Sequence, residues 1–209
     1  MTPAREAFDA ATRALDARDW REFTRWLHPE ALERFRASQL GLARTMATPR
    51  EMPAEGEDAT SLGARLERAR LVSLGFLLER TYRVATVEEL ARLPAEEMVV
   101  RTLESRDPER SYVEWVRAGR PGEDEGADFT PPRIRREYVG EVADGAEAVH
   151  VVFRLTLDGA DGRARSRVLL IELRATPGGW GLMLDEARGD VLLGGLTDAF
   201  VLMEPAGGG

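Results

Sequence analysis

The chain has 209 residues, of which 29 are basic and 37 are acidic, so its formal net charge at pH 7 is −8. Every basic residue is arginine, there is no cysteine, and the two histidines are His28 and His150. The lack of cysteine excludes disulfides, thiolate nucleophiles and cysteine-ligated metals. Two isolated histidines argue against a zinc or iron site, so we expect no metal and no cofactor. The acidic balance argues against nucleic-acid binding.

The composition, 43% hydrophobic and 32% charged, predicts a single globular domain. The longest apolar stretches, such as Val168–Ile171, are far too short to span a bilayer, so no membrane association is expected. Residues 1–6 lack the apolar segment of a secretory signal, and the predicted location is therefore cytoplasmic. Arginine without lysine, in a chain rich in alanine and glycine, indicates the coding bias of a GC-rich bacterial genome.

Residues 1–44 predict N-terminal helices. Apolar side chains recur at steps of three and four between residues 4 and 15, with Thr2 as N-cap and Pro3 at the first helical position. The stretch Asp19 to Glu22 has the capping-box pattern and predicts the start of a second helix. His28-Pro29 ends that segment and predicts a third helix capped by the histidine.

Residues 45–60 lack periodicity and predict a loop, whereas residues 61–117 predict additional helices. Thr86 to Glu89 forms a second capping box, and Asp107-Pro108 predicts the start of a further helical turn. Residues 118–132, acidic and glycine-rich, predict another loop. The helix that resumes near residue 61 is expected to bury one apolar face, made of Leu62, Leu66, Ala69, Val72, Phe76 and Leu77.

Residues 133–187 change to a period of two and predict an antiparallel sheet. The expected strands span residues 133–143, 146–157, 163–175 and 180–185. Their short connections require a meander, because parallel pairing needs long crossovers. The predicted fold class is therefore α+β: N-terminal helices packed on a curved, cone-like C-terminal antiparallel meander, with an enlarged helical middle. Residues 188–209 form a tail expected to pack over the domain or onto a partner.

The first hairpin has a predicted register. A two-residue turn at Asp144-Gly145 would pair Ala143 with Ala146 and place Tyr138 opposite Val151. The face expected to pack under the helices carries Ile134, Tyr138, Gly140, Val142, Val149, Val151, Phe153 and Leu155. The opposite, outer face is expected to carry Glu137, Val139, Glu141, His150, Val152 and Arg154.

The run Val168–Ile171 is apolar on both sides of its strand. Such a run is typical of a strand covered on both faces, either by its own chain or by a partner. Together with Val139 and Val152 on the outer face, it predicts a homodimer that forms through the outer face of the sheet.

Two segments carry a resemblance to a known superfamily. The stretch from Ala17-Arg18-Asp19-Trp20 to Leu27-His28-Pro29-Glu30-Ala31 resembles the opening of nuclear transport factor 2-like proteins, and Pro177-Gly178-Gly179-Trp180 resembles the hairpin before their late strand. The resemblance, to the SnoaL-like and ketosteroid-isomerase-like cone, covers roughly residues 3–35 and 133–187. It implies a sheet wrapped around a helix-capped pocket, in a superfamily of isomerases, dehydratases, cyclases, transport factors and non-catalytic binding modules.

Tyr138 and Arg136 are the candidate pocket residues. Both are expected on the inner face, where a tyrosine can line a ligand pocket and an arginine can bind a carboxylate. With an aromatic wall from Trp26 or Trp180, they would form a cavity for a small apolar ligand. The alternative is a core tyrosine and an arginine that extends to solvent at the sheet edge. His150 is expected on the outer face, beside carboxylates of the neighbouring strand.

Three functional hypotheses remain. The first is a non-catalytic module that binds a small ligand or a protein partner. The alternative is an isomerase- or dehydratase-type enzyme that acts on a small apolar substrate in the cone pocket. The third is an accessory domain whose helical middle is the docking surface. The expected positions of the two histidines leave none in the pocket, which favours the non-catalytic interpretation.

Overall fold

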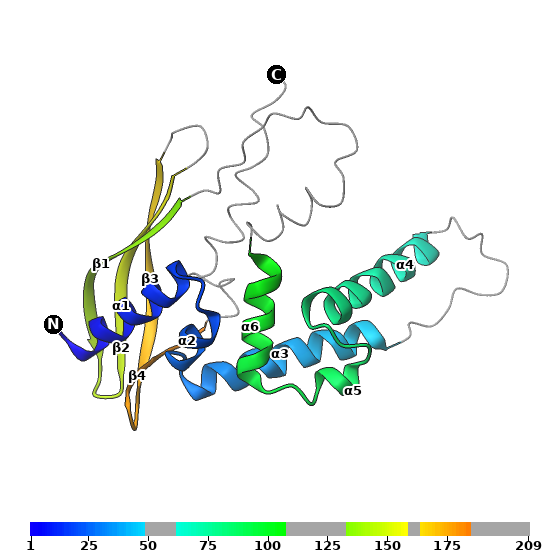
Figure 1. Ribbon diagram of the computed structural model, residues 1–209, viewed down its shortest axis with the longest axis horizontal. Coiled ribbons are helices and arrows are strands. Elements are labelled where there is room, and N and C mark those ends of the chain that lie inside the picture. The colour runs from blue at the N-terminus through cyan, green and yellow to red at the C-terminus, as the bar shows by residue number, and fades with distance from the viewer. Residues whose placement is uncertain (49–61, 108–132, 159–163, 185–209) are drawn as a thin grey trace, which may run out of the picture.

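The computed structural model describes residues 1–48, 62–107, 133–158 and 164–184 (Figure 1). Helices in the N-terminal part precede a four-stranded antiparallel sheet, so the predicted α+β class is confirmed. The helical turn expected after Pro108, the loop 118–132 and the tail 188–209 lie outside the described residues. Within the described ranges, no helix is both long enough and apolar enough to cross a bilayer.

The first three helices begin at the predicted caps. Their bounds are Pro3–Asp16 for α1, Trp20–Arg25 for α2 and Pro29–Ala47 for α3. The side chains of Thr2 and Asp19 each accept a hydrogen bond from the backbone N–H three residues further on, at 3.3 and 2.9 Å. Nδ1 of His28 accepts one from the N–H of Glu30 at 3.2 Å. The third helix continues through residues 45–47, which were expected to open the loop.

The four strands pair in chain order, and every pair is antiparallel. Their bounds are Arg133–Asp144 for β1, Ala148–Asp158 for β2, Ala164–Thr176 for β3 and Gly179–Leu182 for β4. β1 and β4 are therefore the two edges of the sheet. The predicted meander is confirmed, because alternating side chains and short turns together determine this topology.

The predicted register of the first hairpin is wrong. Ala143 pairs with Val149 rather than with Ala146. The turn occupies residues 145–147 instead of Asp144-Gly145 alone, so the two strands are offset from the expected pairing. Gly145 adopts a φ of 74°, a left-handed conformation that glycine permits without strain.

A β-bulge at Val139 changes the register a second time. Tyr138 pairs with Phe153, but after the extra residue Glu141 pairs with Val151. Because side chains alternate along a strand, the bulge exchanges the faces of the residues that follow it. Glu141 therefore lies on the inner face, and Val142 lies on the outer face with 60% of its surface exposed. Both positions are the reverse of the prediction.

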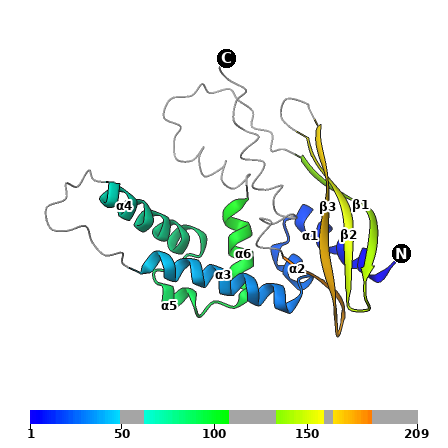
Figure 2. The same cartoon turned by 180° about the vertical axis from the view of Figure 1, so that it is seen from behind.

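The inner face of the sheet packs against α1, which contacts β1, β2 and β4 (Figure 2). The rings of Phe8 and Phe153 lie 5.2 Å apart between centroids, and both side chains are fully buried. Val151, Leu173 and Leu182 are also fully buried in this layer. The predicted inward direction of the β2 residues is confirmed, and side chains fill the space between α1 and the sheet.

The connection between α2 and α3 is hydrogen-bonded through its backbone to the edge strand β4. The N–H of His28 donates to the carbonyl of Leu182 at 2.9 Å, and the N–H of Leu182 donates to the carbonyl of Trp26 at 2.8 Å. These bonds form a short parallel bridge between Leu27 and Leu182. The backbone of His28 approaches β4 closely at Gly181, where a Cβ atom would lie 2.8 Å from the Cα of His28.

The remaining helices form an arm on the far side of α2 from the sheet (Figure 1). Their bounds are Leu62–Gly75 for α4, Phe76–Thr81 for the π-helix η1, Val87–Leu90 for α5 and Ala95–Arg106 for α6. Tyr82, which ends the π-helix, is fully buried between α3 and α6. Its hydroxyl lies 3.0 Å from the side-chain oxygens of both Gln39 and Thr102, which gives the buried group its polar partners.

The expected inward face of α4 is largely exposed. Leu66, Val72 and Phe76 are 51%, 67% and 56% exposed, whereas Leu77 is partly buried against the core. The side of α4 that carries Glu67 and Arg70 is the more buried one. The helical period was predicted correctly, but the direction in which the helix faces was not.

Candidate interaction surface

The outer face of the sheet carries an exposed apolar patch on β1 and β3. Val168 and Leu170 of β3 are 60% and 49% exposed, and Val139 and Val142 of β1 are 52% and 60% exposed. We call these four residues the outer-face patch. Scattered exposed hydrophobic residues are ordinary, but several on one sheet face mark a candidate contact surface.

The patch follows from strand geometry. β3 turns Ile171 and Leu173 inward, so the alternating residues Val168 and Leu170 point outward. They pair with Arg154 and Val152 of β2, which lie on the same outer face. The bulge then adds the side chain of Val139 to this face. The two-sided apolar character of Val168–Ile171 therefore reflects one buried and one exposed side.

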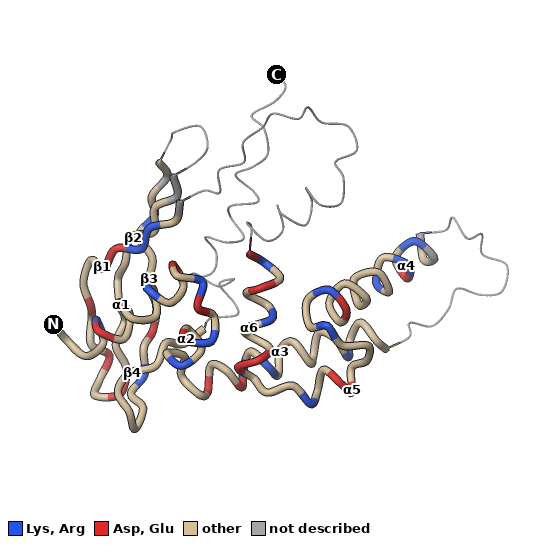
Figure 3. Tube along the Cα trace, in the orientation of Figure 1, with Lys and Arg blue, Asp and Glu red and all other residues tan. Residues whose placement is uncertain are grey.

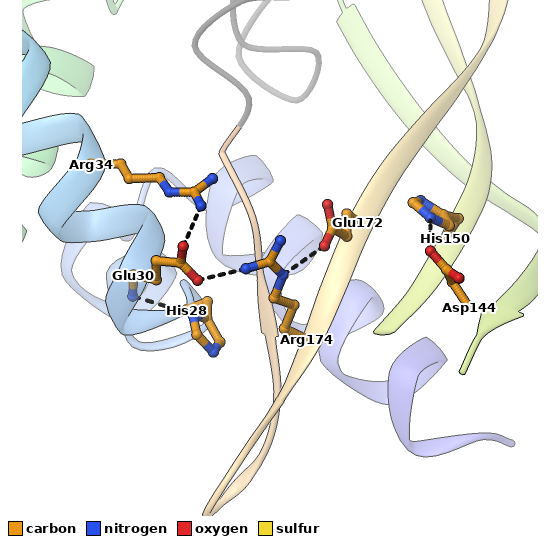
Figure 4. A network of polar contacts seen from close by, with 7 residues as sticks. All are labelled: His28, Glu30, Arg34, Asp144, His150, Glu172 and Arg174. Atoms are coloured by element: carbon orange, nitrogen blue, oxygen red, sulfur yellow. Dashed lines mark hydrogen bonds and ion pairs between the residues drawn. The ribbon is translucent and has the colours of Figure 1, made fainter. Parts of the chain in front are cut away.

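A row of polar side chains borders the patch near the β1–β2 turn (Figure 4). His150 lies on the outer face, as predicted, and its Nε2 is 3.3 Å from a carboxylate oxygen of Asp144. Glu172 pairs with His150 across the strands, but its carboxylate contacts Arg174 at 2.6 Å. The partner of His150 is therefore Asp144 and not one of the carboxylates expected from the sequence, Glu137 and Glu141.

The row continues from the sheet to the start of α3. A second nitrogen of Arg174 donates to Glu30 at 2.5 Å, and Arg34 also donates to that carboxylate (Figure 4). Desolvation acts to raise the pKa of Glu30, but the two guanidinium groups outweigh it and hold the pKa below its ordinary value. The hydrogen bond that Arg174 donates to Glu172 raises the pKa of Arg174. The charges compensate one another, so this row is suited to the rim of an interface.

The predicted pocket residues lie at two edges of the sheet. Arg136 and Tyr138 are on edge strand β1, whereas Trp180 is on edge strand β4 and Trp26 lies beside it. Three strand spacings, about 14 Å, separate the two edges. The structure therefore brings these residues together in pairs and not as one group. Their role as ligand contacts stays a prediction.

Each of the four has a local partner. Arg136, with its side chain 3% exposed, donates to Asp16 at 2.7 Å, and the Arg5 guanidinium lies 4.8 Å from the ring centroid of Tyr138. The indole N–H of Trp26 donates to a carboxylate oxygen of Glu22 at 3.1 Å, and Trp180 pairs with Ala175 of β3. Desolvation raises the pKa of Tyr138, as does the hydrogen-bonded carboxylate of Glu141.

A shallow hollow of about 420 Å³ lies elsewhere, between the C-terminal end of α3 and α5. It is lined by Arg44, Ala47, Thr48, Val87, Glu88 and Ala91. It is open to solvent. Within the described part of the chain, no cluster of His, Asp and Glu side chains is arranged to hold a metal ion.

Comparison with known protein families, curated proteins and solved structures finds no match. Functional inference therefore depends on the surfaces themselves. Sequence reasoning missed the Glu30–Arg174 contact, because it joins residues 144 positions apart. It also missed the exposure of Val142, although Gly140 beside the bulge, a glycine inside a strand, was a signal that could have revealed it.

Proposed function

We propose that the chain is a non-catalytic interaction module of the nuclear transport factor 2-like type that forms a homodimer through the outer face of its sheet. The observation that carries the proposal is the outer-face patch, Val139, Val142, Val168 and Leu170, on a single sheet face. The order of helices and antiparallel strands supports the family assignment, and the opposed edges that hold Tyr138 and Trp180 favour a surface function over a pocket.

The expected strength follows from the exposed side chains. Burying each half-exposed Val or Leu would contribute roughly 1 kcal/mol, so four from each protomer would contribute about 8 kcal/mol. Association costs on the order of 4–15 kcal/mol in lost translational and rotational freedom. The polar rim that includes His150 and Arg174 adds orientation more than affinity. These four side chains alone therefore leave at most about 4 kcal/mol, which corresponds to millimolar affinity. A micromolar dimer needs about 8 kcal/mol net and requires that the surrounding outer face be buried as well.

Sedimentation velocity over a concentration series tests the dimer. The wild-type chain should shift from monomer to dimer. The double variant Val168→Thr with Leu170→Thr should stay monomeric, because threonine is favoured in strands but adds a polar hydroxyl. Leu71→Thr on α4 is a matched control, since Leu71 is 53% exposed but lies outside the sheet. A wild-type chain that remains monomeric at high micromolar concentration would disprove the proposal.

A further inference from the structure

Helix α4, together with Phe76 at the start of η1, presents an apolar side to solvent. Leu66, Val72 and Phe76 are each more than half exposed, and Ala69 between them is exposed as well. Spacings of three and four residues place these side chains on one face of the helix, which we call the α4 stripe. Figures 1 and 2 show α4 at the opposite end of the molecule from the sheet. The stripe is therefore separate from the outer-face patch.

The more buried side of the same helix combines an apolar residue, Leu74, which packs against the core, with a polar pair. Arg70 and Glu67 form an ion pair there, with an Nε–Oε distance of 2.8 Å and side chains only 12% and 26% exposed. Nη1 of Arg70 is buried without a hydrogen-bond partner among the described residues. Removing this pair from water costs free energy, and so does exposing the stripe. A helix that violates both preferences at once is typical of a functional surface rather than of a purely structural element.

Positive charge accompanies the stripe. Arg65 and Arg68 are exposed and form no ion pair with other described residues. The guanidinium of Arg80 lies 5.4 Å from the ring centroid of Phe76. Arginine predominates among the charged positions along α4 (Figure 3). The one exposed acidic residue of the segment 65–81, Glu79, lies at its far end. This region is thus locally basic in a chain whose net charge is −8.

We propose that the α4 stripe docks an acidic amphipathic helix of a partner protein. Leu66, Val72 and Phe76 would be its apolar anchors, and Arg65 and Arg68 would pair with carboxylates of the docked helix. The small residues at the centre of the stripe permit close approach of two helices. Ser73 beside them donates its hydroxyl to the carbonyl of Ala69 at 2.9 Å, so docking leaves that hydroxyl satisfied.

Two other occupants fit the stripe less well. A second copy of the chain would present the same arginines and would lack the complementary negative charge. An anionic membrane would attract the arginines as an acidic helix does, so the apolar side chains decide between these two occupants. The small Ala69 at the centre of the stripe adds little insertion energy compared with a large apolar side chain.

Binding of synthetic helical peptides to the full chain tests the proposal by fluorescence anisotropy. The probe is an amphipathic peptide with leucine on one face and glutamate on the other, and its control has lysine in place of every glutamate. The acidic peptide should bind and should weaken as salt is added, whereas the lysine peptide should not bind. Equal binding of both peptides, or binding of neither, would overturn the proposal.

Variants of the chain locate the binding site. Val72→Ser, and separately Arg65→Glu with Arg68→Glu, should each weaken binding of the acidic peptide by about tenfold. Leu71→Ser is the matched control, because Leu71 is 53% exposed but lies outside the stripe, and this variant should bind as the wild type does. Loss of binding in this control, or retained binding in the arginine variant, would contradict the assignment. If the chain self-associates and the stripe variants do not, the occupant of the stripe is a second copy. If the chain sediments with phosphatidylglycerol vesicles and the stripe variants do not, the occupant is a membrane. Either result would overturn the proposed partner.

Discussion

Replacing Gly181 by alanine should destabilise the fold through a single contact. The new Cβ would lie 2.8 Å from the Cα and 2.9 Å from the backbone nitrogen of His28. Carbon atoms normally approach no closer than about 3.5 Å, so β4 and the start of α3 must separate by roughly 0.7 Å. Both sides of the contact are backbone, and neither can relax by rotating a side chain.

The cost can be worked out from what the separation disturbs. Overpacking of this kind costs about 1–3 kcal/mol. The shift also lengthens the bonds between His28, Leu182 and Trp26, now 2.9 and 2.8 Å, and each lost hydrogen bond costs about 0.5–1.5 kcal/mol. Alanine recovers about 0.4–1 kcal/mol by restricting the unfolded chain. The net loss should be about 2–4 kcal/mol, or a fall in Tm of about 5–15 °C for a chain of this size.

Urea and thermal unfolding, followed by circular dichroism, measure this loss. Gly140→Ala is the matched control: Gly140 is also in a strand, but a Cβ there has nothing within 4 Å, so its stability should change by less than about 0.5 kcal/mol. If Gly181→Ala unfolds at the same urea concentration as Gly140→Ala, the close approach between β4 and His28 does not constrain the fold. A similar loss in both variants would mean that the effect comes from glycine in strands and not from this contact.

Two further predictions concern buried polar groups. Burial raises the pKa of Tyr82 to about 12. An unfolded tyrosine ionises about two units lower, so the native state holds the proton longer and the free energy of unfolding should fall by about 2 kcal/mol from pH 10 to pH 12. In urea unfolding, Tyr82→Phe should lose this part of the pH dependence, and an unchanged slope would exclude Tyr82 as its source. Desolvation lowers the pKa of Arg136 and raises that of its partner Asp16. The attraction between the two charges is therefore smaller than the free-energy cost of burying them. The free energy of unfolding of Arg136→Met should therefore be within about 1 kcal/mol of the wild-type value. Asp16→Asn leaves the guanidinium buried without this carboxylate, so its free energy of unfolding should be about 1–3 kcal/mol lower. A larger loss in Arg136→Met than in Asp16→Asn would show that the ion pair is net stabilising.

The features that the sequence predicted correctly depend on neighbours in the chain. Thr2, Asp19 and His28 cap helices because each side chain meets a backbone N–H two or three residues further on. The spans of the four strands were predicted for the same reason, since alternation and turn residues are local. The end of α1 was less predictable, because Arg18 adopts a φ of 56° at a position where glycine is the usual signal.

The features that were predicted wrongly depend on contacts between distant segments. The bulge at Val139 reverses the faces of Glu141 and Val142, and the neighbouring Gly140 is compatible with a bulge but does not require one. The orientation of α4 depends on its packing beside α3, and the periodicity of Leu66, Val72 and Phe76 fixes only which residues share a face. A hydrophobic period predicts that a face is apolar, and it does not predict whether the covering element belongs to the same chain.

That distinction links the two exposed surfaces. The layer between α1 and the sheet is filled by fully buried side chains such as Phe8 and Phe153. The exposed apolar residues are those against which no other described segment of the chain packs. On the sheet these exposed apolar residues include Val168 and Leu170, and on the helical arm they form the α4 stripe. Both are regular elements whose periodicity is that of a buried face. Exposed apolar surface on a regular element lowers solubility unless a partner covers it, so two such surfaces at opposite ends of the molecule favour a protein that joins partners over one that encloses a substrate.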